Sequence, residues 1–132
     1  MSKQLKIGVV GVGWFGSIHV EVWNSLSEVA LVSVCDKDPS RFHCPKSSLQ
    51  DSFHEATEQF ADMPRLPPHC KTYSDLHEML EEERLDVVDI TVTETDHFPV
   101  AQAALKAGCH VIVEKPLTLS HEEGQELKRL SQ

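Results

Sequence analysis

The sequence has little positive charge and no long apolar run. It contains 12 Lys and Arg residues against 21 Asp and Glu residues, and its formal net charge is −9 at pH 7. Binding to nucleic acid requires clustered cations that displace the counterions of the phosphate backbone, so this balance argues against a nucleic-acid partner. The same negative charge repels anionic membranes, and no apolar stretch has the length of a membrane span or of a signal-peptide core. We therefore expect a cytoplasmic protein that binds neither nucleic acid nor membranes.

Cysteine is present, but without the spacing of a metal site or of a disulfide framework. The four cysteines are Cys35, Cys44, Cys70 and Cys109, and none belongs to a C-x-x-C pair. Two of them lie beside predicted buried strands, so reduced thiols are favoured over disulfides, and we predict no metal site. A chain of 132 residues has the length of one domain, which we assign to residues 1–132.

A glycine-rich turn follows the first apolar run of the chain. Residues 6–10 predict a buried strand, and Gly11, Gly13 and Gly16 then form the pattern G-x-G-x-x-G at the start of a helix. In a dinucleotide-binding loop the first glycine allows a tight turn, the second lets a pyrophosphate approach the backbone, and the third allows close packing of helix and strand. The helix N-terminus attracts the phosphates through its N–H groups and its dipole. Taken alone, the pattern is equally typical of an ordinary glycine turn.

The residues after this turn favour the dinucleotide interpretation. Residues 30–35 predict a second buried strand, which ends at Asp36. This acid lies about twenty residues after Gly16, where dinucleotide folds place the carboxylate that binds the adenosine ribose hydroxyls. Its charge favours NAD over NADP, because it would face a 2′-phosphate. Lys37 and Arg41 could instead bind such a phosphate, so NADP remains the alternative. The helix between the two strands is predicted to have an apolar face made of Phe15, Ile18, Val22 and Leu26.

The rest of the chain continues the alternation of strands and helices. We predict strands over residues 69–73, 86–92 and 110–113, a broken helical region over residues 39–68, and helices capped by Ser74, by Thr95 or Asp96, and by Ser120. Strands that are apolar on both faces and alternate with helices indicate a parallel sheet between helical layers. We therefore predict an α/β fold of the Rossmann type, a doubly wound parallel sheet of five strands with helices on both faces. Ligands bind across the carboxyl ends of such strands, so residues 11–16, Asp36, residues 93–97 and Lys115 are expected at one edge.

The segment from Gly108 to Leu117, GCHVIVEKPL, closely resembles the glucose–fructose oxidoreductase, inositol dehydrogenase and rhizopine-catabolism protein family, abbreviated Gfo/Idh/MocA. The resemblance runs from about residue 6 to the C-terminus and includes the glycine turn, His19, Asp36 and His97. It implies an N-terminal domain that binds NAD or NADP for hydride transfer to or from sugars, inositols and related polyols.

The resemblance also implies a role for the segment Glu114-Lys115-Pro116. Lys115 is expected near the nicotinamide as the catalytic residue, where its ammonium can hydrogen-bond to the reacting oxygen and stabilise developing negative charge. Glu114 and Pro116 are expected to shape its turn. The candidate cofactor-binding residues are therefore Gly11, Val12, Gly13, Trp14, Phe15, Gly16, Asp36, Lys37, Arg41, Thr93, Glu94, His97, Glu114, Lys115 and Pro116.

Two departures from the family pattern keep alternatives open. Val92-Thr93-Glu94 stands where the family commonly has Thr-Pro-Asn, and the family's sixth strand and its second, substrate-binding domain have no counterpart in the chain. The first hypothesis is the NAD(P)-binding domain of an oxidoreductase that acts on a sugar-, inositol- or polyol-like substrate and needs the second domain for turnover. The alternative is a non-catalytic nucleotide-binding or scaffold module with the same fold. Because the strand at residues 110–113 would have a bare, apolar outer edge, we also expect the chain to form a homo-oligomer.

Overall fold

The computed structural model describes residues 2–43 and 66–132. Along the chain these residues form β1 (Leu5–Val10), α1 (Trp14–Ser25), β2 (Val29–Cys35), the 3₁₀ helix η1 (Pro39–Phe42), β3 (Lys71–Tyr73), α2 (Leu76–Glu83), β4 (Val87–Ile90), α3 (Glu94–Lys106), β5 (His110–Val113) and α4 (His121–Ser131). η1 begins as the sequence predicts, because Asp38 caps it by accepting a hydrogen bond from the N–H of Ser40. Most of the predicted broken helical region, residues 44–65, lies outside the described residues.

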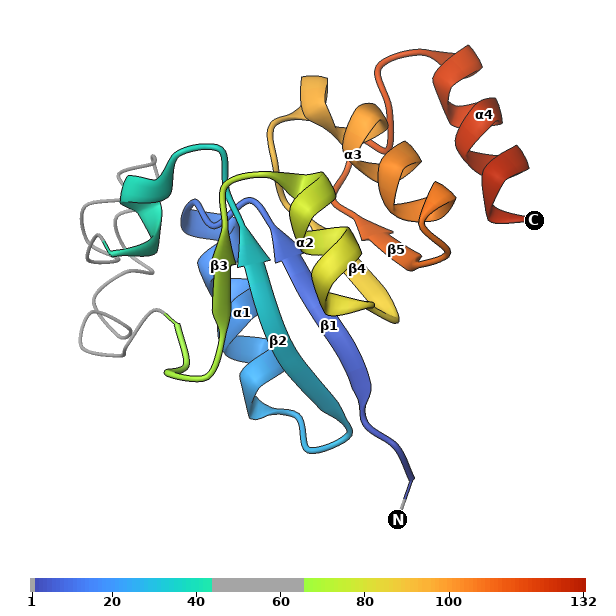
Figure 1. Cartoon of the computed structure of the whole chain (residues 1–132). Coiled ribbons are helices and arrows are strands. Elements are labelled where there is room, and N and C mark those ends of the chain that lie inside the picture. Colours follow the sequence, from blue (N-terminus) through green and yellow to red (C-terminus); the bar gives the residue numbers. More distant parts are fainter. Residues whose placement is uncertain (1, 44–65) are drawn as a thin grey trace.

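The five strands form one parallel sheet in the order β3-β2-β1-β4-β5 (Figure 1). The chain builds outward from β1 through β2 to β3, and then crosses back to place β4 on the other side of β1. The direction of winding therefore reverses between β1 and β4. Connections that leave these two strands diverge to opposite faces, and a crevice opens at their carboxyl ends. This architecture confirms the predicted doubly wound Rossmann fold.

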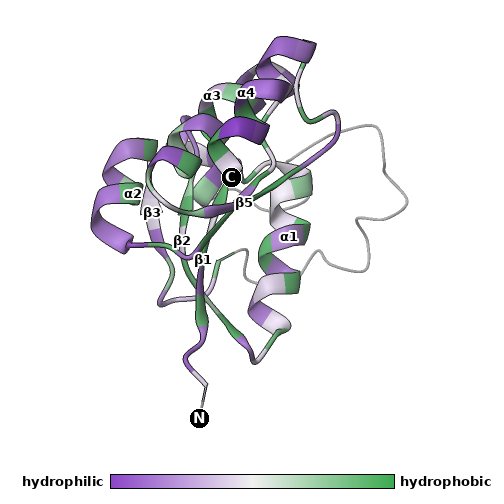
Figure 2. Cartoon of the chain, turned by 90° about the vertical axis from the view of Figure 1, so that its right-hand side faces the viewer, coloured by the Kyte–Doolittle hydropathy of each residue, from purple (hydrophilic) through white to green (hydrophobic). Residues whose placement is uncertain are grey.

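Helices cover both faces of the sheet, and each face has its own apolar core (Figure 2). α1 packs on β1 and β2, and its Val20 is buried with Ile7 and Val9 of β1. On the opposite face, α2 and α3 pack over a core that includes Val10 and Met79. Successive residues of a strand point to opposite faces, so a strand covered on both sides is apolar along most of its length.

The buried face of α1 differs from the predicted one. Phe15, Val22 and Leu26 are exposed, whereas Gly16 and Val20 point into the protein. The prediction was wrong because apolarity alone does not determine the rotation of this helix. Gly16 must lie against the turn at Gly11, where no larger residue fits, and this contact turns the neighbouring large side chains outward.

Several element boundaries also differ from the predictions. Asp75, not Ser74, caps α2 by accepting a hydrogen bond from the N–H of Glu78. α3 begins at Glu94 rather than after Thr95 or Asp96, and Pro99 lies inside the helix. β3 and β4 are shorter than expected, because strand hydrogen bonding extends only over the residues that pair with a neighbour. Gly108 follows α3 with a φ of +85°, a left-handed conformation that glycine adopts without steric cost at the end of a helix.

β5 is an edge strand of the sheet in the described part of the chain, and Ile112 on it is 44% exposed. α4 packs against α3 (Figure 1). Cys35, Cys70 and Cys109 are free thiols, as the sequence predicts for these three positions. Of the helices in residues 2–43 and 66–132, none has the length and apolarity to cross a membrane.

Candidate functional site

A cavity of about 580 Å³ opens at the carboxyl edge of the sheet. The glycine turn after β1 and Asp36 after β2 line one side of it, and the connection from β4 to α3 lines the other. Residues 74–77, from the connection after β3 and the start of α2, complete the lining. The cavity thus lies at the crevice that the sheet topology creates, and its size suits an organic ligand.

The three glycines of the turn meet different surroundings. Gly11 has a φ of +91°, and a Cβ on it would lie 2.8 Å from the carbonyl carbon and oxygen of Thr91. A Cβ on Gly16 would overlap the carbonyl oxygen of Gly11. A Cβ on Gly13 would meet only the Arg41 guanidinium, at 3.2 Å, and this long side chain can move. Gly11 and Gly16 are therefore required for the close backbone contacts of the turn. Gly13 instead leaves space in the cavity at the start of α1.

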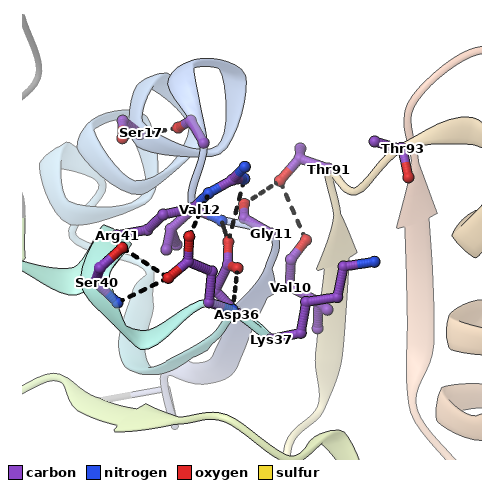
Figure 3. A network of polar contacts seen from close by, with 12 residues as sticks. Val10, Gly11, Val12, Ser17, Asp36, Lys37, Ser40, Arg41, Thr91 and Thr93 are labelled. Atoms are coloured by element: carbon purple, nitrogen blue, oxygen red, sulfur yellow. Dashed lines mark hydrogen bonds and ion pairs between the residues drawn. The ribbon is translucent and has the colours of Figure 1, made fainter. Parts of the chain in front are cut away.

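Thr91 connects the end of β4 to the glycine turn (Figure 3). Its backbone N–H donates to the carbonyl oxygen of Val10 at 2.8 Å, and its hydroxyl lies 2.6 Å from the carbonyl oxygen of Gly11. A hydroxyl has one proton to donate, and the shorter distance assigns it to Gly11. These bonds hold the turn against the neighbouring strand.

Asp36 connects the same turn to the end of β2 (Figure 3). It is only 5% exposed, and its Oδ2 accepts a hydrogen bond of 2.9 Å from the N–H of Val12. Its Oδ1 accepts another of 2.9 Å from the N–H of Asp38, and the Arg41 Nη1 lies 3.7 Å from Oδ2. Each carboxylate oxygen has two lone pairs, so both retain capacity to accept a ligand hydroxyl. Asp36 thus positions the turn and also borders the cavity.

The two cations beside Asp36 are engaged by carboxylates. Lys37 Nζ lies 3.0 Å from Asp96 Oδ2 and links the end of β2 to the first turn of α3. Arg41 Nε lies 3.8 Å from Asp38 Oδ2, in addition to its contact with Asp36. Hydrogen bonds from Ser40 keep the pKa of Asp38 below its usual value, so this carboxylate is ionised at neutral pH. A second anion near these cations would compete with charges that are already present.

Cys35 lines the cavity as a thiol, not as a thiolate. Burial, and to a smaller extent the neighbouring Asp36, raises its pKa to about 12. Nucleophilic and metal-binding cysteines act as thiolates, so Cys35 contributes packing to the site.

The segment Glu114-Lys115-Pro116 lies at the same edge of the sheet, because it follows the carboxyl end of β5. The peptide bond between Lys115 and Pro116 is cis. Lys115 is exposed, and within residues 2–43 and 66–132 its ammonium has no hydrogen bond or ion pair. His97 lies behind the segment and is 1% exposed. Its Nδ1 is 2.6 Å from the Pro116 carbonyl oxygen.

The structure divides the predicted site residues into two groups. Those that line the cavity are Gly11, Gly13, Trp14, Phe15, Asp36, Lys37, Arg41 and Thr93. Those that lie outside its lining are Val12, Gly16, Glu94, His97, Glu114, Lys115 and Pro116. Val12 and Gly16 shape the turn from behind, and His97 contacts the backbone next to Lys115. For all fifteen residues, a direct role in cofactor binding stays a prediction.

Sequence reasoning missed part of the lining. Ser74, Asp75 and His77 follow β3, and Pro99 belongs to α3. Each follows the carboxyl end of a parallel strand, and this position is the signal that could have identified them.

The fold, the glycine turn and the cavity together define a dinucleotide-binding domain of the Rossmann class. Residues 5–132 match the family described as "Oxidoreductase family, NAD-binding Rossmann fold". The chain is 30% identical to a UDP-N-acetylglucosamine 3-dehydrogenase of Acidithiobacillus ferrooxidans over 129 residues, which are 98% of this chain and 34% of that protein. It is 33% identical to an inositol 2-dehydrogenase of Salmonella typhimurium over 122 residues, which are 92% of this chain and 31% of that protein. The chain thus spans about a third of the length of these curated relatives.

A solved structure shows the same likeness. GenD2 from gentamicin A biosynthesis, in complex with NAD, superposes with a TM-score of 0.74 at 27% identity, and the match covers 99% of this chain and 32% of GenD2. The chain belongs to the Gfo/Idh/MocA family of oxidoreductases, as its sequence resemblance indicates, and forms the NAD-binding Rossmann fold of that family.

Gly13 and Gly16, at the start of α1, give a matched pair of variants. We expect Gly16→Ala to destabilise the fold by several kcal/mol, because its Cβ would overlap backbone that cannot move away. Gly13→Ala should change stability by about 1 kcal/mol or less, because only a flexible side chain must move. The same variant should weaken NADH binding at least tenfold by obstructing the approach to the helix N-terminus. Urea unfolding and calorimetric titration measure the two effects, and unimpaired NADH binding by folded Gly13→Ala would contradict this assignment.

Proposed function

We propose that residues 1–132 form one domain that binds the dinucleotide of an oxidoreductase acting on a hydroxyl or carbonyl group of a sugar-, inositol- or polyol-like substrate. The observation that carries this proposal is the common position of the cavity and Lys115 at the carboxyl edge of one parallel sheet. The dehydrogenase names of the relatives support the substrate class. Because the chain spans about a third of their length, we propose that turnover requires a chain of the relatives' length. The free thiols support the proposed cytoplasmic location.

The residues of the cavity fit the adenosine and pyrophosphate part of a dinucleotide. Gly13 leaves room for a phosphate beside the N-terminus of α1, and as the N-cap residue it has no side chain to block that approach. Asp36 lies at the end of β2 with lone pairs available for ribose hydroxyls. When bound, the nicotinamide supplies hydride transfer.

Lys115 carries the proposed chemistry of the chain itself. Its exposed ammonium, without a partner in the described residues, can donate a hydrogen bond to the substrate oxygen. During reduction of a carbonyl group the ammonium donates a proton to this oxygen as the hydride reaches the carbon, and during oxidation of an alcohol the neutral amine takes that proton back as the hydride leaves. A lysine already paired with a carboxylate would perform this role less well, since its charge would be partly neutralised.

NADH should bind about tenfold more tightly than NADPH, which corresponds to about 1.4 kcal/mol. A 2′-phosphate would meet the Asp36 carboxylate, and Lys37 is already engaged by Asp96. Asp96→Asn removes that competing charge. It should reduce the preference for NADH over NADPH, because Lys37 can then turn toward the 2′-phosphate. Calorimetric titration of both chains with both nucleotides measures the ratio. Equal or tighter binding of NADPH by the unaltered chain would refute the assignment.

Lys115→Ala should abolish turnover while leaving the fold intact and NADH affinity within about tenfold of the original. The reason is that Lys115 lies outside the cavity lining, so it adds little to binding of the adenosine half. Turnover is measured in a chain of the relatives' length, and NADH binding in the 132-residue chain. Lys106→Ala, which removes another exposed lysine, is the control and should retain activity. An ordinary kcat in the Lys115 variant would remove its catalytic role.

We also propose that the 132-residue chain self-associates through the edge of β5. Val111, Ile112 and Val113 present no charge or proline that would prevent strand pairing, and Ile112 is 44% exposed. We expect the chain to form a dimer at micromolar concentration. Ile112→Lys should raise the dissociation constant of this dimer at least tenfold. Val22→Lys, at an equally exposed apolar position on α1, should leave the dimer intact. Sedimentation equilibrium measures the oligomeric state. A monomeric unaltered chain, or a dimer that is weakened only by Val22→Lys, would exclude the β5 edge as the interface.

A further inference from the structure

Asp89 lies in β4, an interior strand of the sheet, and is 1% exposed. Its Oδ2 accepts a hydrogen bond of 2.6 Å from Trp23 Nε1 and lies 2.7 Å from His19 Nδ1, both on α1. Its Oδ1 is buried and has no partner among the described residues. Burying a carboxylate in an apolar core is costly unless it is paired and hydrogen-bonded. His19 is therefore held as a donor to Asp89.

The other ring nitrogen of His19 faces a second carboxylate. His19 Nε2 lies 3.3 Å from Oε1 of Glu114, the residue before Lys115. A neutral imidazole that donates through Nδ1 would direct its Nε2 lone pair at this oxygen, which is repulsive. An imidazolium donates a hydrogen bond to Asp89 and forms an ion pair with Glu114. The geometry thus favours the charged ring.

The charged groups that act on His19 agree with this protonation state. They are the carboxyl groups of Asp89 from β4 and Glu114 from the end of β5. The hydrogen bond with Asp89 is the largest cause that raises the pKa of His19 above its usual 6.5. Burial, the second largest effect, opposes this rise, and the charges of Asp89 and Glu114 add smaller increases.

A second histidine holds the other end of the same segment. His97 Nδ1 lies 2.6 Å from the carbonyl oxygen of Pro116, and its Nε2 lies 3.1 Å from that of Val92. Glu114 is thus linked to α1 and β4, while Pro116 is linked to α3. Lys115 lies between these two attachment points, so its backbone position depends on both.

We propose that His19 is a positioning residue whose charged ring, anchored by Asp89, holds Glu114 and thereby fixes the backbone of Lys115. The significance of this position for catalysis rests on the proposed function, but the coupling itself does not. Proton loss from His19 would release Glu114 and loosen the attachment of the segment to α1. The position of Lys115 would then depend on pH through a residue that lies outside the cavity lining.

Nuclear magnetic resonance of the 132-residue chain without dinucleotide tests this coupling. The imidazole ¹⁵N shifts of His19 and the backbone amide shifts of Lys115 are followed between about pH 5 and 9, the range in which histidine titrates. We expect both to change with the same midpoint. Glu114→Gln should lower the midpoint of the His19 titration and remove the pH dependence of the Lys115 amide shifts. Asp89→Asn should lower the titration midpoint at both His19 and Lys115.

The control distinguishes this coupling from a general effect of histidine titration. His19→Gln should remove the pH dependence of the Lys115 amide, whereas His121→Gln, at an exposed histidine at the start of α4, should leave it unchanged. The proposal is overturned if the amide shifts of Lys115 do not change with the midpoint of His19. It is also overturned if they still follow that midpoint in Glu114→Gln. Should Asp89→Asn fail to fold, Glu114→Gln still decides, because Glu114 is only half-buried.

The stability of the chain gives a second readout with a defined sign. Because the pKa of His19 is raised in the folded state, the stabilisation is fully present below pH 6.5 and is lost as the pH rises through the raised value. The difference in urea midpoint between the unaltered chain and His19→Gln should therefore decrease with rising pH, and a constant difference would contradict the charged ring. Loss of NADH binding with the coupling intact would refute the proposed function and leave this inference standing.

Discussion

The contact between Gly16 of α1 and the carbonyl oxygen of Gly11 is the constraint on which the rest of the site depends. It brings the start of a helix against the end of a strand more closely than any side chain would allow. The contact determines the rotation of α1, which puts Val20 into the core and Phe15 outside. It also directs the helix N-terminus toward the cavity, where a phosphate is stabilised by N–H groups and the helix dipole. One steric requirement at Gly16 thus determines both the packing of α1 and the direction in which its N-terminus faces a ligand.

Polar bonds then hold this turn from two neighbouring strands. The hydroxyl of Thr91 fixes Gly11 from β4, and the carboxylate of Asp36 fixes Val12 from β2. Both groups lie at the carboxyl ends of parallel strands, where side chains from distant parts of the sequence converge. A dinucleotide would therefore meet a turn whose shape is already set, so that little binding free energy is lost in ordering it.

The region around Lys115 is built on a different principle. Its neighbours Glu114 and Pro116 are attached through two histidines to three other elements, while the lysine ammonium remains exposed. The net charge of −9 describes the whole chain and does not by itself describe the electrostatics of the site. Asp36, Asp38, Asp89 and Asp96 each pair with a nearby cation, histidine or N–H group, so local pairing, not overall acidity, determines the electrostatics of the site.

The sequence by itself determined the fold class and the general location of the site. Apolar strands alternating with helices admit few topologies, and the spacing from Gly11 to Asp36 places both at one edge of the sheet. It did not determine which face of α1 is buried, because four apolar residues at helical spacing cannot reveal a contact made by a glycine. Nor did it identify Asp89, whose role depends on His19 and Glu114, residues remote in sequence that meet only when β4, α1 and β5 pack. Local patterns encode secondary structure, whereas the partners of a buried charge are known only once the chain has folded around it.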